Sequence, residues 1–115
     1  MKLNQLLTEI LEECIKSGYS DIHLTSGVAP MGRLHGRLKV IETETWPQDG
    51  LDNLIHECLS HEEKDELRER FSVDSSVSLR QHRFRFNIFK ERNGPAFAIR
   101  RLESLNRTIA DLGLP

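Results

Sequence analysis

Apolar and polar side chains follow two different rhythms along the first part of the chain. Before Gly18, apolar residues recur at the spacing of one face of a helix, and Gly18 is a helix-stop signal. From Ser20 to Thr25, apolar residues recur at every second position, as in a half-buried strand. The pattern predicts a helix and then a strand, and the helix presents Leu3, Leu6, Leu7, Ile10, Leu11, Cys14 and Ile15 on one face.

A hairpin is expected after this strand. Residues 31–35 and 37–41 look like two short strands, and Gly36 between them tolerates the positive φ of a tight turn. Three further strands are predicted near 73–79, 81–92 and 95–102. The last two are separated by Asn93-Gly94, a strong hairpin-turn signal.

Two helices are predicted between these groups of strands. Capping boxes beginning at Thr45 and Ser60 mark their starts, because such side chains satisfy the free amide groups of a first turn. The second helix is mostly charged, with Leu67 and Phe71 as its expected apolar anchors. The order of helix, strands, two helices and strands predicts an α+β fold with a mostly antiparallel sheet. The apolar stripe of the first of these helices is Leu51, Leu54, Ile55, Cys58 and Leu59.

The composition fits one globular domain. With 115 residues, of which 37% are hydrophobic and 30% charged, the chain can bury a single core. Nothing in it reaches the length of a membrane span, and the acidic residues near its start are unlike a secretory signal. A net charge of −2 gives no general attraction to nucleic acid. We therefore expect a cytoplasmic domain whose Cys14 and Cys58 are buried free thiols.

The last two predicted strands concentrate arginine on one face. A two-residue turn at 93–94 places Asn87 opposite Arg100. The same register places Arg85 opposite Leu102 and makes Arg85 and Arg100 diagonal neighbours. One face is then apolar apart from Arg101, with Phe84, Phe86, Ile88, Phe97 and Ile99. The other face carries Arg83, Arg85, Asn87, Ala96, Ala98 and Arg100.

Two interpretations of this arginine face stay open on the pattern alone. Two guanidinium groups so close together can both reach one phosphate group. The alternative is a solvated sheet face on which the arginines pair with local carboxylates. A nucleic-acid module is disfavoured, because Phe84 and Phe86 point away from Arg83 and Arg85 and cannot share a stacking surface with them.

Three motifs follow one another along the chain: Ser20-Asp21-Ile22-His23-Leu24, Pro30-Met31 leading to His35-Gly36, and Arg83-Phe84-Arg85-Phe86-Asn87. They resemble successive motifs of the PilT-like pilus retraction ATPases, members of the secretion ATPase superfamily. The end of the chain, 109–115, is also similar to that family's linker into its ATPase domain. The resemblance covers nearly the whole chain and depends on the order of the motifs. One predicted helix precedes the first motif, and the resemblance therefore favours the retraction branch of the superfamily.

The resemblance implies a PAS-like amino-terminal domain over residues 1–103 and the start of a linker to a RecA-like ATPase domain over 104–115. For the full-length protein it implies a six-membered ring that uses ATP and Mg²⁺ to disassemble pili at the inner face of the inner membrane. The expected partners are the chain's own ATPase domain, neighbouring subunits of the homo-hexamer and the pilus platform in the inner membrane. No nucleic acid is expected.

The resemblance also assigns Arg85 and Arg100 to the nucleotide phosphates, with Arg83 as a looser match. No catalytic residue is expected here, because the chain has no Gly-Lys pair and therefore no P-loop. The 115 residues alone should hold no cofactor and hydrolyse no ATP. No metal is expected, since no two of the five histidines have zinc-site spacing. His23 is expected to make a structural hydrogen bond or to contact the ATPase domain.

One further function stays open, that of a freestanding PAS-like module that senses a small apolar ligand. Such a module needs a cavity between its sheet and its helices. The aromatic residues of the apolar hairpin face would have to leave room for that cavity. An open cavity in the core would therefore favour the sensing module, and a filled core would favour the motor domain.

Overall fold

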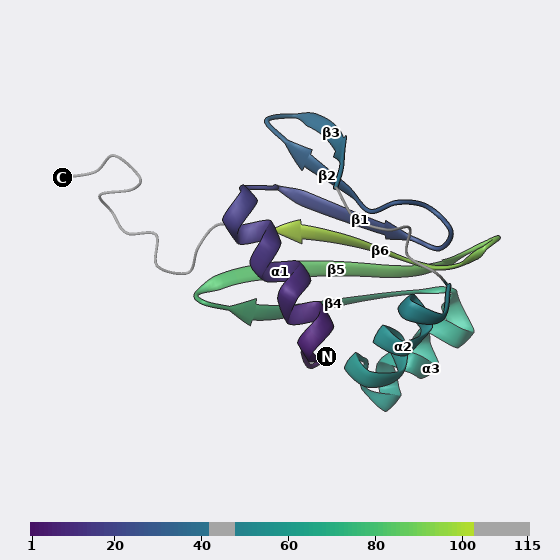
Figure 1. The fold of residues 1–115 in the computed structure, drawn as a ribbon. Helices are drawn as coiled ribbons and strands as arrows, with labels where there is room; N and C mark the ends of the chain where they lie inside the picture. The colour runs from purple at the N-terminus through teal and green to yellow at the C-terminus, as the bar shows by residue number, and fades with distance from the viewer. Residues whose placement is uncertain (42–47, 103–115) are drawn as a thin grey trace.

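The computed structural model describes residues 1–41 and 48–102, which form one antiparallel sheet and three helices (Figure 1). The α+β class is confirmed, with an N-terminal helix and two helices between the strand groups. None of the described helices is long and apolar enough to cross a membrane. The elements are α1 (Gln5–Ser17), β1 (Asp21–Thr25), β2 (Met31–Leu34), β3 (Arg37–Val40), α2 (Gln48–Cys58), α3 (His61–Arg70), β4 (Ser72–Leu79), β5 (His82–Glu91) and β6 (Gly94–Arg101).

The sheet joins the two ends of the described chain. Its strand order is β3-β2-β1-β6-β5-β4, and every neighbouring pair is antiparallel. The first strand therefore pairs with the last at the centre of the sheet (Figure 1). This pairing is the long-range step of the fold, because all the other strand pairs are hairpins.

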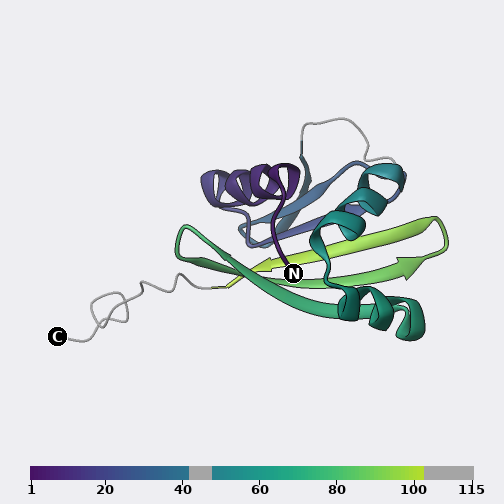
Figure 2. The same cartoon turned by 90° about the horizontal axis from the view of Figure 1, so that it is seen from below.

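The hydrophobic core lies between the sheet and the three helices. Alternate residues of β1, β5 and β6 point to it, as the sequence pattern predicted. Phe86 and Phe97 meet there edge to face, with ring centroids 6.4 Å apart. Viewed from below, α1 and α2 lie on the same side of the sheet (Figure 2). The core includes Leu7, Leu11 and Cys14 from α1, Leu51, Leu54 and Cys58 from α2, Leu67 from α3, and Ile22, Leu24, Val73, Phe84, Ile88 and Ile99 from the sheet.

The prediction that Phe71 anchors α3 is wrong. Leu67 is buried, but Phe71 is 64% exposed and follows the helix in left-handed backbone with φ of 65°. Its amide bonds to the Leu67 carbonyl and ends the helix there. The left-handed residue turns the chain out of the helical stripe, so the spacing that relates Leu67 to Phe71 no longer applies.

The predicted register of the last hairpin is wrong by two residues. Arg92 and Asn93 form the turn, and Glu91 pairs with Gly94. Gly94 takes the left-handed backbone, with φ of 129°, as the first residue of β6 rather than inside the turn. Because side chains alternate with a period of two, a shift of two residues leaves both faces as predicted. The partners across the strands change instead.

Both cysteines are buried free thiols, as expected. The Cys14 thiol donates to the Tyr19 carbonyl at 3.3 Å. Burial raises the pKa of Cys14 to about 11, although the nearby charge of Arg101 opposes that rise. The protonated thiol of Cys14 is therefore a core group rather than a reactive one.

Glu63 ties the surface helix α3 to the sheet. The capping box predicted at Ser60 is present, with Glu63 accepting from the Ser60 amide at 2.8 Å. Glu63 also accepts from the hydroxyl of Ser75 on β4, and the Met1 amino group lies 3.0 Å away. The other predicted box, at Thr45, lies outside the described residues. One carboxylate thus serves a helix start and a strand at once.

We expect Glu63→Gln to lower the free energy of unfolding by about 1–2 kcal/mol, because charge-assisted hydrogen bonds become neutral ones. Urea denaturation at neutral pH measures this change. Glu66→Gln is the matched control, since Glu66 is exposed on the same helix and should change stability by less than about 0.5 kcal/mol. Equal effects of the two substitutions would contradict the role given to Glu63.

Candidate functional site

The face of the sheet that lies opposite the helices carries the polar and charged side chains of the candidate site. All three helices pack on the apolar face, so the polar side chains of the strands stand on an open surface. Asp21 and His23 of β1 alternate with buried Ile22 and Leu24. Arg85 and Asn87 of β5 alternate in the same way with buried phenylalanines. The alternation that builds the core therefore also builds this face.

One row of directly paired residues crosses this open face through five strands. Arg33 of β2 pairs with Asp21 of β1, and Asp21 pairs with Arg100 of β6. Arg100 pairs with Arg85 of β5, which pairs with Ser76 of β4. The row therefore holds three positive charges and one negative charge. Two of the positive charges, those of Arg100 and Arg85, are immediate cross-strand neighbours.

The adjacent row explains why a hollow forms beside the two arginines. His23, Ala98, Asn87 and Asp74 are paired in that order across β1, β6, β5 and β4. Ala98 is the smallest of these side chains and lies between two larger ones. The hollow has a volume of about 330 Å³ and is lined by Asp21, His23, Asp74, Arg85, Asn87, Ala98, Ile99 and Arg100.

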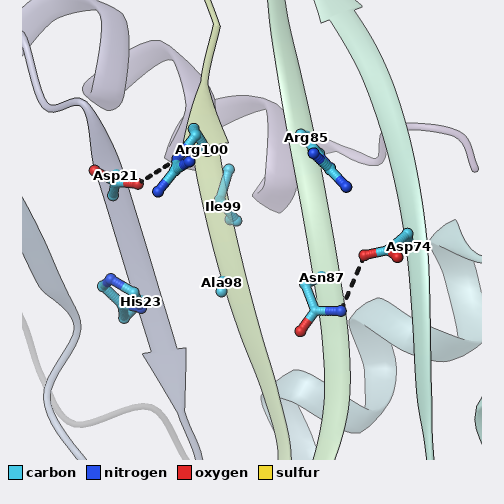
Figure 3. Close-up of a pocket in the computed structure, with 8 residues that line it drawn as sticks. All are labelled: Asp21, His23, Asp74, Arg85, Asn87, Ala98, Ile99 and Arg100. Atoms are coloured by element: carbon cyan, nitrogen blue, oxygen red, sulfur yellow. Dashed lines mark hydrogen bonds and ion pairs between the residues drawn. The ribbon is translucent and has the colours of Figure 1, made fainter.

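The two arginines that share this hollow point in opposite directions (Figure 3). Arg100 turns toward β1, where its Nε donates to Asp21 Oδ1 at 3.1 Å. Arg85 turns toward β4 and has no ion pair among the described residues. The local pairing that the sequence left open is thus realised for Arg100 but not for Arg85. An anion above the pair would have to draw the two head groups together.

Asp21 is held by several groups at once. Ser20 Oγ donates to Asp21 Oδ2 at 2.8 Å, and Arg33 Nε lies 3.8 Å from the same oxygen. Partial burial by itself would raise the pKa of Asp21, but the Ser20 hydrogen bond and the hydrogen bond and charge of Arg100 outweigh it. The pKa of Asp21 is therefore lower than its ordinary value of 3.8. The carboxylate is ionised at neutral pH and competes for nearby cations.

The remaining predicted residues lie at the edges of the site. Arg83 lines a second hollow, which it shares with Arg85 but not with Arg100, and donates to Ser76 Oγ at 3.2 Å. Arg83 does not line the hollow that Arg85 and Arg100 share. The imidazole of His23 lines the first hollow and has no hydrogen-bond partner within residues 1–41 and 48–102. The structural hydrogen bond expected for His23 is therefore not seen in this part of the chain.

The arrangement suits the recognition of a multiply charged anion. Guanidinium groups donate several hydrogen bonds in a fixed plane that matches phosphate oxygens. Among the described residues there is no group of histidine, cysteine or acidic side chains that could hold a metal ion. Asp21 was missed by sequence reasoning. Its alternation with Ile22 indicates the right face, but nothing local indicates that β1 pairs with β6.

The opposite face, where a ligand-sensing module would need its cavity, is filled by aromatic side chains. Phe84, Phe86 and Phe97 are at most 1% exposed, and they occupy the space between sheet and helices. The geometry therefore favours the polar face as the binding surface.

Comparison with known proteins gives related ATPases. No family model matches the chain. The type IV pilus retraction ATPase PilT of Pseudomonas aeruginosa is 28% identical over 109 residues, which are 94% of this chain and 32% of that protein. The type IV pilus ATPase PilU of the same organism is 27% identical over 109 residues, 93% of this chain and 28% of PilU. The chain spans about a third of the length of these curated relatives.

Solved structures give the same relationship. The pilus retraction motor PilT with bound ADP has a TM-score of 0.79 and 35% identity, over 100% of this chain and 33% of that one. The ATPase DotB of Legionella pneumophila has a TM-score of 0.73 at 18% identity, also over 100% of this chain and 33% of its own. At that identity the likeness to DotB shows the fold alone.

We expect the contribution of Asp21 to stability to depend on pH. Its pKa is lowered by folding, so its contribution is present above the unfolded-state pKa and is lost as pH falls through the folded-state pKa. At pH 7, Asp21→Asn should lower the free energy of unfolding by about 0.5–1.5 kcal/mol. The deficit should shrink below about pH 4. Urea denaturation at several pH values measures it.

Asp52→Asn serves as the control for this pH series. Asp52 is an exposed carboxylate without an ion pair among the described residues. Its replacement should change stability little at any of these pH values. A deficit of Asp21→Asn that stays constant from pH 7 to about pH 3 would contradict the ionic role of Asp21.

Proposed function

We propose that this chain, a relative of the pilus retraction and secretion ATPases of the PilT-like kind, is the PAS-like amino-terminal domain of such a motor. In that role it presents Arg85 and Arg100 to the phosphates of a nucleotide that an adjoining ATPase domain holds. Arg83 has a supporting part at the edge of the same surface. The motor would use ATP and Mg²⁺ and would act at the inner face of the inner membrane.

The observation that carries this proposal is the direct pairing of Arg85 with Arg100 across the strands, beside a hollow with Ala98 in its floor. Directly opposite residues have Cβ atoms about 4.5–5.5 Å apart, so both guanidinium groups can reach a single phosphate. Like charges so placed repel each other, and an anion between them removes that repulsion. The solved PilT structure contains ADP, a ligand with the phosphate chemistry that this pair suits.

The division of labour follows from the chemistry that this chain lacks. The 115 residues contain no Gly-Lys pair, so they supply no P-loop to cradle phosphates and bind magnesium. An ATPase domain would bind the nucleotide, and this domain would add positive charge from the other side of the cleft. Such charge stabilises a transferring phosphoryl group through fixed hydrogen-bond donors.

Exposed apolar side chains support contacts with other domains of a ring. Leu38 and Val40 of β3 are 50% and 58% exposed, and they share rows with residues of the open face. They lie at the end of the sheet away from Arg85. Neighbouring exposed apolar side chains on one strand are typical of surfaces that meet another protein. The partners we propose are the chain's own ATPase domain, neighbouring subunits of a homo-hexamer and the pilus platform in the membrane.

In the longer protein that carries this domain beside an ATPase domain, we expect Arg85→Ala and Arg100→Ala each to slow ATP hydrolysis by at least about tenfold. The effect of an arginine supplied to a phosphoryl group, about 10³–10⁵ in rate, sets the upper limit. Nucleotide affinity should change less, because the P-loop supplies most of the binding. Steady-state phosphate release, with a separate nucleotide-binding titration, measures both quantities.

Arg92→Ala is the matched control for these substitutions. Arg92 is exposed in the turn between β5 and β6, away from the hollow, and should leave turnover unchanged. If both Arg85→Ala and Arg100→Ala hydrolysed ATP as fast as the unmodified protein, the nucleotide role would be wrong. The arginines would then belong to a solvated sheet face.

We expect Leu38→Lys together with Val40→Lys to weaken ring assembly of that longer protein while the domain stays folded. The added charges would lie on exposed positions of a short edge strand, so the hydrophobic core would not change. Light scattering across a concentration series measures assembly, and circular dichroism of the 115-residue chain checks folding. Lys39→Ala is the control in the same strand. Unchanged assembly would remove these two residues from the proposed interface.

A further inference from the structure

The carboxylate of Asp21 is bonded to Arg100, one of the two arginines of the proposed phosphate site. Asp21 Oδ1 accepts from Arg100 Nε at 3.1 Å, and the Asp21 side chain is only 15% exposed. Arg100 itself is 71% exposed, so its head group has room to turn away from β1. Arg85, the other member of the pair, has no ion pair among the described residues.

We infer that Asp21 is a built-in competitor that holds Arg100 away from the site until a phosphate group displaces it. This inference rests on the proposed role of Arg85 and Arg100 and adds a residue that controls that role. Arg85 would meet the incoming phosphate first, since no carboxylate restrains it. Arg100 would then exchange one anion for another.

The surroundings of Asp21 make such an exchange possible in both directions. When Arg100 leaves, Asp21 keeps the Ser20 hydrogen bond at 2.8 Å and the Arg33 charge at 3.8 Å. The carboxylate therefore keeps partners, and the free-energy cost of a partly buried charge without a partner does not arise. When the phosphate leaves, Asp21 is the nearest anion to which Arg100 can return. The resting and the occupied arrangements thus each satisfy the charges present.

Competition of this kind also selects among anions. A singly charged anion gains little by replacing a carboxylate that the fold already positions beside Arg100. A diphosphate or triphosphate group brings more charge and can engage Arg85 and Arg100 together. The ligand class that this arrangement favours is a polyphosphate, such as that of a nucleotide, over chloride, acetate or a single carboxylate side chain.

The test is a titration of the 115-residue chain with inorganic pyrophosphate at low ionic strength, followed through the NMR signals of the arginine Nε–H groups. We expect Asp21→Asn to tighten pyrophosphate binding about two- to tenfold, the range set by the loss of one competing ion pair. In an Arg100→Ala background the same substitution should give no gain, because nothing remains to be released.

Asp74→Asn is the matched control, since Asp74 lines the same hollow but bonds to Asn87 rather than to an arginine. If Asp74→Asn tightened binding as much as Asp21→Asn, the gain would come from removing any negative charge near the hollow, and the inference would be overturned. The inference also fails if Asp21→Asn leaves binding unchanged while Arg85→Ala and Arg100→Ala weaken it, although the phosphate site would then stand. If no variant alters pyrophosphate binding, or none binds, the proposed site fails as well.

A measurement on the unsubstituted chain keeps the test independent of whether Asp21→Asn folds. During the pyrophosphate titration, the carboxyl carbon signal of Asp21 should shift in step with the Nε–H signal of Arg100. Movement of the Arg100 signal with a constant Asp21 signal would overturn the exchange.

Discussion

The pairing of β1 with β6 is the constraint on which the fold and the site both depend. It joins residues 21–25 to residues 96–100 and so closes almost the whole described chain into one sheet. Closing so long a loop costs conformational entropy before any contact compensates for it. Ile22 and Leu24 of β1 and Phe97 and Ile99 of β6 provide that compensation, because all four are buried beneath the helices. The same pairing, on the opposite face, brings Asp21 beside Arg100.

Most of the elements could be predicted because each is encoded by its own neighbours in sequence. The helical stripe before Gly18 and the capping box at Ser60 depend only on residues a few positions apart. The two faces of the last hairpin could be assigned for the same reason, since a period of two needs no knowledge of the partner strand. The failures also have local causes. Phe71 adopts left-handed backbone, which a count of apolar spacings cannot detect. The Asn93-Gly94 turn signal placed the turn of the last hairpin one residue too late.

The site could be predicted only in part, because its halves come from opposite ends of the sequence. Arg85 and Arg100 lie on one hairpin, so the pattern identified both and their shared face. The predicted register made them diagonal neighbours, whereas in the structure they are directly paired and therefore closer together. Asp21 could not be added without knowing the strand order. Its effect on Arg100 is a tertiary property, invisible to motif spacing and to composition.

The separation of core and site onto two faces lets each meet a different physical demand. The buried face needs dense apolar packing, and three phenylalanines supply it without polar atoms. The open face can hold three arginines and one aspartate in a row because solvent screens the repulsion that would be prohibitive inside. The charge of Arg85, which has no ion pair within residues 1–41 and 48–102, costs the fold little while water covers this face. If another domain covered the surface and excluded water, as we propose, the same charge would become strong enough to require an anion.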